Sequence, residues 1–434
     1  MRSWGADPAR AAIGVRRPFV VLWLATLLFY LGFQLLLPVI PLYATELGAR
    51  EAHVGLIIGV FALAAMVPRP IAGDLADRIG RRPLVLLGTA IFALAPLGYA
   101  VVGTIPGLLV LRLFHGTGMG FGPTAATVIA TDLTPPERRG AAMGVYGLAS
   151  AVALAVGPYL GGELVRRLGF TWTFLVATAI EAGALVLAWT LPETRPAGGL
   201  APAPAEAPDG LVSVRGMLAR FWHRWFSTAA VYPSGLVLAL YVSYGGLAAL
   251  LPLFAERRQL GNPGLFFTVF ALVSLVVRSP AGRLSDRLGR RAVVAPALAI
   301  SGGGLVLLGL AWSQGTFLAA AALYGVGFGA GQPALLAMTA DRVPPGERGR
   351  AMGTLYTAWE LGISGGSIVL GLCATRLGYA ATWWIAAAIA GMGALAALYP
   401  GGRCGSGRAG GVSARRRARR LRAAAPAGRG RPRQ

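Results

Sequence analysis

The chain has 434 residues, of which 55% are hydrophobic and 13% charged, and its mean hydropathy is +0.62. This balance excludes an ordinary soluble domain, because long uninterrupted apolar runs are typical of membrane-spanning helices. A net charge of +23 would suit a nucleic-acid-binding protein. The basic residues are all Arg, however, and they gather in termini and connections predicted on one side of a membrane. We therefore expect no specific nucleic acid and place both termini in the cytoplasm.

Six apolar helices are predicted in each half of the chain. After a basic cytoplasmic leader, residues 1–18, the first six fall within 19–191, at about 19–43, 53–72, 84–102, 107–130, 141–162 and 172–191. Residues 192–228 form a cytoplasmic linker that is rich in Pro, Ala and Gly where it begins. The other six helices fall within 229–400, at about 229–254, 265–281, 292–312, 317–340, 351–375 and 380–399. The basic tail, 401–434, is expected to be disordered and to lie near anionic lipid.

The two halves repeat each other at an offset of 209 residues, since 286 − 77 = 209. Each half carries a polar segment between its second and third helices, here called a signature segment. The first (73–82) contains Gly73, Asp77, Arg78, Gly80, Arg81 and Arg82, and the second (282–291) contains Gly282, Asp286, Arg287, Gly289 and Arg290. We interpret both as short turns, because glycines permit tight turning and Asp and Arg can pair with each other or with helix ends.

The signature segments resemble the cytoplasmic loop signature of the major facilitator superfamily. The resemblance covers residues 19–399 and implies an all-α polytopic membrane protein of twelve transmembrane helices in two pseudo-symmetric six-helix bundles. Internal duplication within an apolar chain is typical of such transporters. By this resemblance, the signature residues and Arg69 are expected to control gating.

Five charged residues fall inside the predicted helices: Arg69, Arg112, Glu181, Arg278 and Glu360. A charge at the membrane centre costs ~2.5–3.5 kcal/mol, so each is a functional candidate. Arg112 and His115 share a helix face, and Arg112 before a Gly-rich run resembles the family's helix-4 motif, which is implicated in proton coupling. We predict proton coupling by Arg112, His115, Glu181 and Glu360. The alternative is that Arg112 bonds to helix carbonyls while His115 and Glu181 are ordinary packed residues.

The resemblance implies that helices 2 and 11 pack together between the bundles. At 1.5 Å per residue, Arg69 lies ~12 Å and Glu360 ~15 Å deep, so the two are predicted to meet there. The residue related to Arg69 by the offset is Arg278, but the residue related to Glu360 is Ala151. The ion pair is therefore expected on one side only. Arg278 is left to interact with water, a carbonyl group or an anionic ligand.

Gly157, Pro158, Gly161 and Gly162 resemble the family's antiporter motif, which favours export over import. The resemblance also implies that helices 1, 4, 7 and 10 line a central site. The candidates for substrate binding, together with Arg278, are Tyr30, Gln34, Arg112, His115, Tyr241, Tyr244, Tyr324 and Gln332. The alternative for these residues is ordinary helix packing.

We predict a monomeric secondary transporter of the inner or plasma membrane that exports a small organic compound, a drug or metabolite, in exchange for protons. One alternative is a proton symporter or a uniporter for a metabolite or organic anion, and another is a receptor or scaffold that transports nothing. Nothing indicates an enzyme, because the three His and two Cys residues show no metal-ligand spacing. No cofactor or metal is expected. The expected partners are the substrate, protons and anionic lipid.

Overall fold

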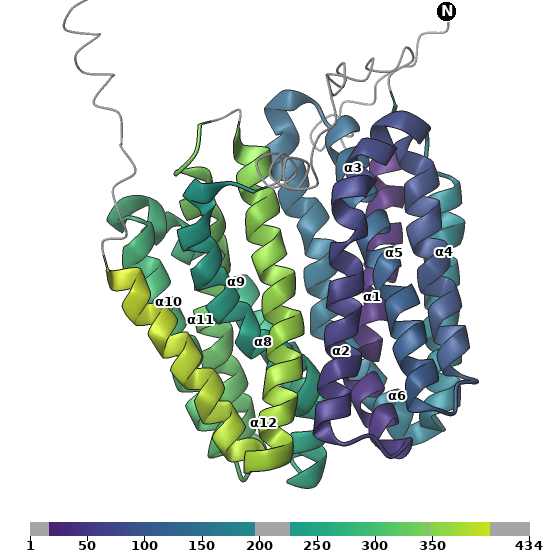
Figure 1. The fold of residues 1–434 in the computed structure, drawn as a ribbon. Helices are drawn as coiled ribbons and strands as arrows, with labels where there is room; N and C mark the ends of the chain where they lie inside the picture. Colours follow the sequence, from purple (N-terminus) through teal and green to yellow (C-terminus); the bar gives the residue numbers. More distant parts are fainter. Residues whose placement is uncertain (1–16, 196–225, 345–346, 400–434) are drawn as a thin grey trace, which may run out of the picture. The chain divides into compact units, whose positions relative to one another are not determined.

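The computed structural model describes residues 17–195, 226–344 and 347–399, without the side chains of Pro70, Asp74 and Asp77. Most of the predicted leader and linker, and the whole tail, lie outside the described residues. The described elements are α1 (Arg17–Glu46), α2 (Glu51–Met66), α3 (Pro68–Ile79), α4 (Arg81–Tyr99), α5 (Ile105–Asp132), η1 (Pro136–Arg138), α6 (Arg139–Trp189), η2 (Thr228–Ala230), α8 (Val231–Arg257), α9 (Gly264–Leu288), α10 (Arg290–Gly309), α11 (Gln314–Ala340) and α12 (Arg348–Leu398) (Figure 1).

The all-α prediction is confirmed, since the described segments contain helices and no strand. Seven of the described helices are long and apolar enough to cross a membrane by themselves. Two of these, α6 and α12, each join two helical arms across a kink. The number of twelve crossings stays a prediction.

The kinks of α6 and α12 occur at repeat-related glycines. Gly169 has φ 78° and ψ 177°, and Gly378 has φ 79° and ψ 171°. Glycine adopts this left-handed region without a Cβ penalty, so one residue turns the chain and no separate loop is formed. Figure 1 shows the two arms of α12 meeting at a sharp bend.

The prediction that the signature segments are turns is wrong for most of their length. Helix α3 continues to Ile79 and α9 to Leu288, so each segment is mainly the last turns of a helix. Only Gly80 (φ 106°) and Gly289 (φ 90°) break the helical path. The predicted helix 53–72 is also divided, because Pro68 has no backbone N–H and starts α3 after α2 has ended.

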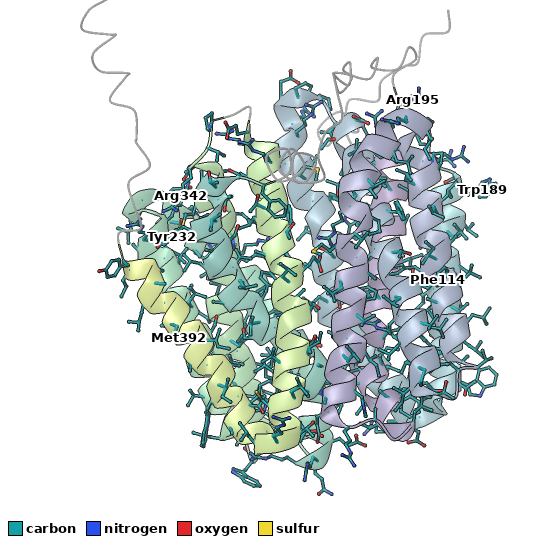
Figure 2. All side chains as sticks on the ribbon, in the orientation of Figure 1. Phe114, Trp189, Arg195, Tyr232, Arg342 and Met392 are labelled. Carbon is teal, nitrogen blue, oxygen red and sulfur yellow. The ribbon has the colours of Figure 1, made fainter. Side chains whose placement is uncertain are left out.

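Large apolar side chains cover the outside of the helices. Trp189 is 65% exposed, Met392 62% and Phe114 39%, and Figure 2 shows them at the periphery. Exposed apolar surface of this extent would be unstable in water. It suits a protein whose helix flanks face lipid.

The halves approach closely at the end opposite the signature segments. There α2 packs on α12, where a Cβ on Gly55 would lie 2.2 Å from the carbonyl oxygen of Ser367. Likewise α6 packs on α9, where a Cβ on Gly264 would lie 2.2 Å from the carbonyl oxygen of Pro158. Such distances exist only because the residues are glycines. Both contacts join residues of the first half to residues of the second.

The antiporter-like motif takes part in this packing. Gly157 and Gly161 lie against Gln34 and Leu35 of α1, and Gly162 lies against Asn262. Asn262 Nδ2 donates to the Tyr159 carbonyl at 3.0 Å. The motif therefore joins α6 both to its own bundle and to α9.

We predict that Gly264→Ala disfavours this conformation, because the added methyl group would overlap the Pro158 carbonyl. Overpacking costs about 1–3 kcal/mol, so disulfide formation between Cys residues placed at positions 159 and 262 should fall about fivefold or more. Gly147→Ala is the control, since nothing lies within 4 Å of a Cβ there. Unchanged cross-linking in Gly264→Ala would contradict the prediction.

Candidate functional site

The two signature segments make the same ion pair. Arg81 Nε lies 3.3 Å from Asp132 Oδ2, and Arg290 Nε lies 2.8 Å from Asp341 Oδ2. The two arginines are related by the 209-residue offset, and so are the two aspartates. Arg81 thereby ties the start of α4 to the end of α5, and Arg290 ties the start of α10 to the end of α11. Each of these two ion pairs fastens helices of one half.

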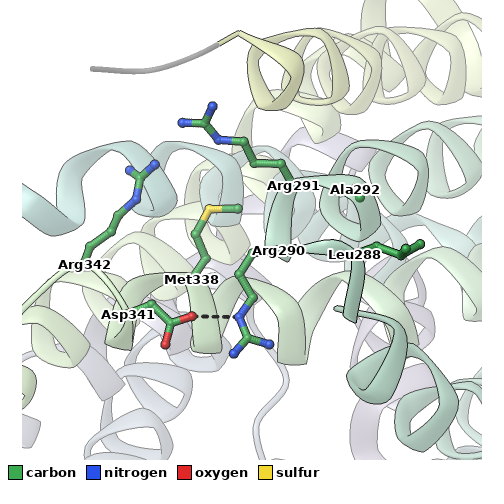
Figure 3. Close-up of a pocket in the computed structure, with 8 residues that line it drawn as sticks. Leu288, Arg290, Arg291, Ala292, Met338, Asp341 and Arg342 are labelled. Atoms are coloured by element: carbon green, nitrogen blue, oxygen red, sulfur yellow. Dashed lines mark hydrogen bonds and ion pairs between the residues drawn. The ribbon is translucent and has the colours of Figure 1, made fainter. Parts of the chain in front are cut away.

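The surroundings of the second pair are more open. A pocket of about 400 Å³ is lined by Leu288, Gly289, Arg290, Arg291, Ala292, Met338, Asp341 and Arg342 (Figure 3). It lies at the helix ends and contains none of the residues predicted to bind substrate. Arg290 also pairs with Asp286 of the same segment. The side chain of Asp77, which is related to Asp286 by the offset, lies outside the described residues.

Glu193 holds the first signature segment from the end of α6. Its Oε1 accepts from the backbone N–H of Arg81 at 3.0 Å and its Oε2 from that of Arg82 at 3.1 Å. Partial burial acts to raise the pKa of Glu193, but hydrogen bonds from backbone N–H groups outweigh it and hold this pKa below its usual value. Glu193 was not predicted as a site residue, because the second half has no carboxylate at the related position, where residue 402 is Gly.

The predicted ion pair between the halves is present. Arg69 Nη2 of α3 lies 2.7 Å from Glu360 Oε1 of α12, with side chains 30% and 7% exposed. The pair lies between the close-packed end and the signature segments: Glu360 is twelve residues from Arg348, where α12 begins, and seven from Ser367 of the close-packed contact. Its position therefore makes it a link between the halves at mid-helix.

Arg112 and His115 lie inside the first half. Arg112 Nε donates to the Ile57 carbonyl at 3.2 Å, and its guanidinium lies 4.2 Å from the Phe61 ring centroid. His115 is fully buried, and its Nδ1 lies 3.0 Å from Tyr99 Oη. These contacts match the packing alternative for both residues. Their part in proton coupling stays a prediction.

Glu181 is fully buried against α1. Neither carboxyl oxygen has a hydrogen-bond partner among the described residues, although the backbone N–H of Phe33 lies near. A Cβ on Gly32 would lie 2.4 Å from Glu181 Oε1, so the carboxyl group occupies the space that this glycine leaves. Gln34, the residue after Phe33, is also buried. Its Oε1 has no hydrogen-bond partner in the described part of the chain.

A polar chain joins three predicted site residues of the second half. Arg278 Nη2 donates to Gln332 Oε1 at 3.1 Å, and Gln332 Nε2 donates to Tyr241 Oη at 2.7 Å. The Tyr241 ring stacks on Trp359, with centroids 4.1 Å apart. Trp359 was not predicted as a site residue, although its position beside Glu360 in the sequence could have indicated it.

Two predicted substrate residues belong to an aromatic cluster instead. Tyr324 shares a hydrogen bond of 2.9 Å with Ser243. Its ring packs beside Phe270 and Phe328, and Tyr244 packs against the same two rings. These contacts match ordinary helix packing. In the described segments no group of three His, Cys, Asp or Glu residues could hold a metal ion.

We predict that removing one member of the Arg69–Glu360 pair is more damaging than removing both. Arg69→Ala and Glu360→Ala should each lower the free energy of unfolding by about 1–3 kcal/mol, because a charge stays unpaired among the helices. The double variant should be less destabilised than either. Arg166→Ala is the control, since that side chain is 71% exposed. Additive losses in detergent unfolding would show that the two residues act independently.

Glu193→Ala should lower the free energy of unfolding by about 1 kcal/mol at neutral pH, as loss of a helix cap does. Because folding lowers the Glu193 pKa, the stabilisation is present above about pH 4.3 and is lost as pH falls through the folded value. Thermal unfolding of the variant and wild type should therefore converge as pH falls below the folded pKa of Glu193. Glu256→Ala, which removes an exposed carboxylate, should leave the unfolding temperature unchanged at every pH. A loss in Glu193→Ala that does not shrink as pH is lowered would contradict the cap.

The chain matches known proteins along most of its length. Tetracycline resistance protein, class G, from Vibrio anguillarum is 30% identical over 83% of this chain and 91% of that protein. Multi-drug resistance efflux pump PmrA of Streptococcus pneumoniae is 25% identical over 84% and 91%. The structure of the human organic anion transporter MFSD10 aligns with a TM-score of 0.61 at 24% identity, covering 88% of this chain and 99% of that one. The family model described as Major Facilitator Superfamily matches residues 22–267 and 262–423. The protein is therefore an integral membrane protein that belongs to the Major Facilitator Superfamily of transporters.

Proposed function

We propose that this protein exports a small organic compound from the cell in exchange for protons, with both termini in the cytoplasm. The observation that carries the proposal is the Arg69–Glu360 ion pair, which joins the two halves between apolar helices. Two relatives named for tetracycline resistance and multidrug efflux support export. The antiporter-like residues of α6 support the same direction.

Alternating access follows from where the halves touch. The close glycine contacts of α2 with α12 and of α6 with α9 shut the end opposite the signature segments. Opening that end requires these contacts, and the link at mid-helix, to separate. The signature residues, including Asp77, would then favour one of the two conformations.

Protonation of Glu360 provides a way to release the link. A neutral carboxyl group keeps a hydrogen bond but loses the charge attraction to Arg69, so separation of the halves becomes easier. Proton binding would thus be coupled to the change of access. Glu181 is a second candidate carrier, because its carboxyl group is buried with no charged partner among the described residues.

Transport can be tested with the full chain in proteoliposomes whose lumen is acidic. Wild type should accumulate radiolabelled tetracycline while the gradient lasts and release it when an ionophore collapses the gradient. A receptor or scaffold would show neither accumulation nor counterflow. A uniporter would equilibrate the compound without accumulating it.

We predict that Glu360→Gln abolishes accumulation but retains counterflow, because Gln cannot carry a proton. Glu181→Gln should do the same if Glu181 also carries protons. Glu256→Gln is the control, since that carboxylate is exposed at the end of α8. If Glu181→Gln still accumulates the compound, Glu181 has no part in coupling. If both variants accumulate it, the carrier is another group, such as His115, or transport is not driven by protons.

A further inference from the structure

The repeat relation exposes an asymmetry in the charges between the halves. In the seam of α3 and α12, Arg69 meets Glu360 at 2.7 Å. The residues related to them by the offset are Arg278 of α9 and Ala151 of α6, since 69 + 209 = 278 and 360 − 209 = 151. The second seam therefore keeps the guanidinium group and lacks the carboxylate.

Arg278 has a neutral partner instead. It donates to the amide oxygen of Gln332, whose amide nitrogen is held by Tyr241 Oη at 2.7 Å. The Tyr241 contact fixes the orientation of the amide, so its oxygen faces Arg278. An amide accepts a hydrogen bond but does not neutralise the charge. No carboxylate pairs with Arg278 in the described part of the chain.

Arg278 lies well inside the helix and is exposed. It is ten residues from Leu288, the last residue of α9, which corresponds to ~15 Å along the axis. A cation at that depth is unfavourable unless water or an anion reaches it.

The seam is open where Arg278 lies. Thr268 Oγ1 donates to the Ala155 carbonyl at 2.6 Å, so α6 and α9 touch near the close-packed end. Beyond that contact, Val152 of α6 is 41% exposed and Leu275 of α9, seven residues from Thr268 and on the same helix face, is 38% exposed. The facing surfaces of α6 and α9 are therefore only partly covered at the level of Arg278.

We propose that Arg278 and Gln332 bind the carboxylate of a small organic acid, which takes the place of the glutamate that the second seam lacks. The inference rests on the proposed transport function and names its substrate class. A guanidinium group binds carboxylates through paired, charge-assisted hydrogen bonds. Ala151 leaves the facing position without a side chain that could compete.

The test measures binding of benzoate to the purified full chain by calorimetry, with benzamide as its uncharged counterpart. Wild type should bind benzoate and not benzamide. Arg278→Gln should raise the dissociation constant about tenfold or more, as expected for losing hydrogen bonds to a charged group.

Ala151→Glu should weaken benzoate binding to the same extent, because it rebuilds the missing ion pair within the chain. Leu148→Glu is the matched control: it adds the same charge one turn away on the exposed stripe of α6 and should bind benzoate like wild type. Thermal unfolding verifies that each variant is folded. Because Ala151→Glu supplies a partner for Arg278, it should be at least as stable as wild type.

Three results would overturn the proposal: equal affinity for benzoate and benzamide, no change in Arg278→Gln, or equal loss in Ala151→Glu and Leu148→Glu. A fourth result would also overturn it: if the purified protein binds phosphatidylglycerol vesicles through Arg278 but does not bind free benzoate, Arg278 is assigned to lipid. The binding assay needs no pH gradient. If benzoate binding depends on Arg278 but no gradient-driven transport is found, the proposed function alone is refuted. If tetracycline transport is driven by the gradient but benzoate binding does not depend on Arg278, this inference alone is refuted.

Discussion

A charged group between apolar helices needs a partner, and this requirement shapes the interior of the protein. Arg69 meets a carboxylate, Arg112 meets a carbonyl oxygen and an aromatic face, and Arg278 meets an amide. The three kinds of partner differ in how easily another group can replace them. A carboxylate loses its charge on protonation, whereas a carbonyl oxygen or an aromatic face does not respond to pH. Only the first pair is therefore suited to proton control, and only the third is suited to exchange with an external anion.

Small residues provide the complementary constraint. The halves touch where glycines allow backbones to approach, and packing of this kind has few intermediate arrangements because interiors are dense. A contact made by glycine is either closed or separated. This property gives a transporter two defined states with little strain in either. In the proposed mechanism, the Arg69–Glu360 ion pair adds the dependence on protonation.

Much of this could be predicted from the sequence, for identifiable reasons. Hydropathy and the fixed offset predicted helices in two related halves. Helical rise placed Arg69 and Glu360 at similar depths, and the family resemblance placed their helices side by side. Together these two arguments predicted the contact. Helical spacing put Arg112 and His115 on one face, but periodicity does not say which neighbour that face meets. The structure turns it toward Ile57 and Tyr99 within the first half. Glu193 acts through two backbone N–H groups, and backbone partners leave no pattern in a sequence.

The glycine kinks have a consequence for how the chain meets proteases. Helix resumes directly after Gly169 and Gly378, so neither bend offers the extended stretch of backbone that a protease must bind. The connections at 47–50, 100–104, 258–263 and 310–313 are not helical. At the end opposite the signature segments, cleavage would fall at those four connections. The arms of α6, and likewise those of α12, would leave such a digest as single covalent hairpins.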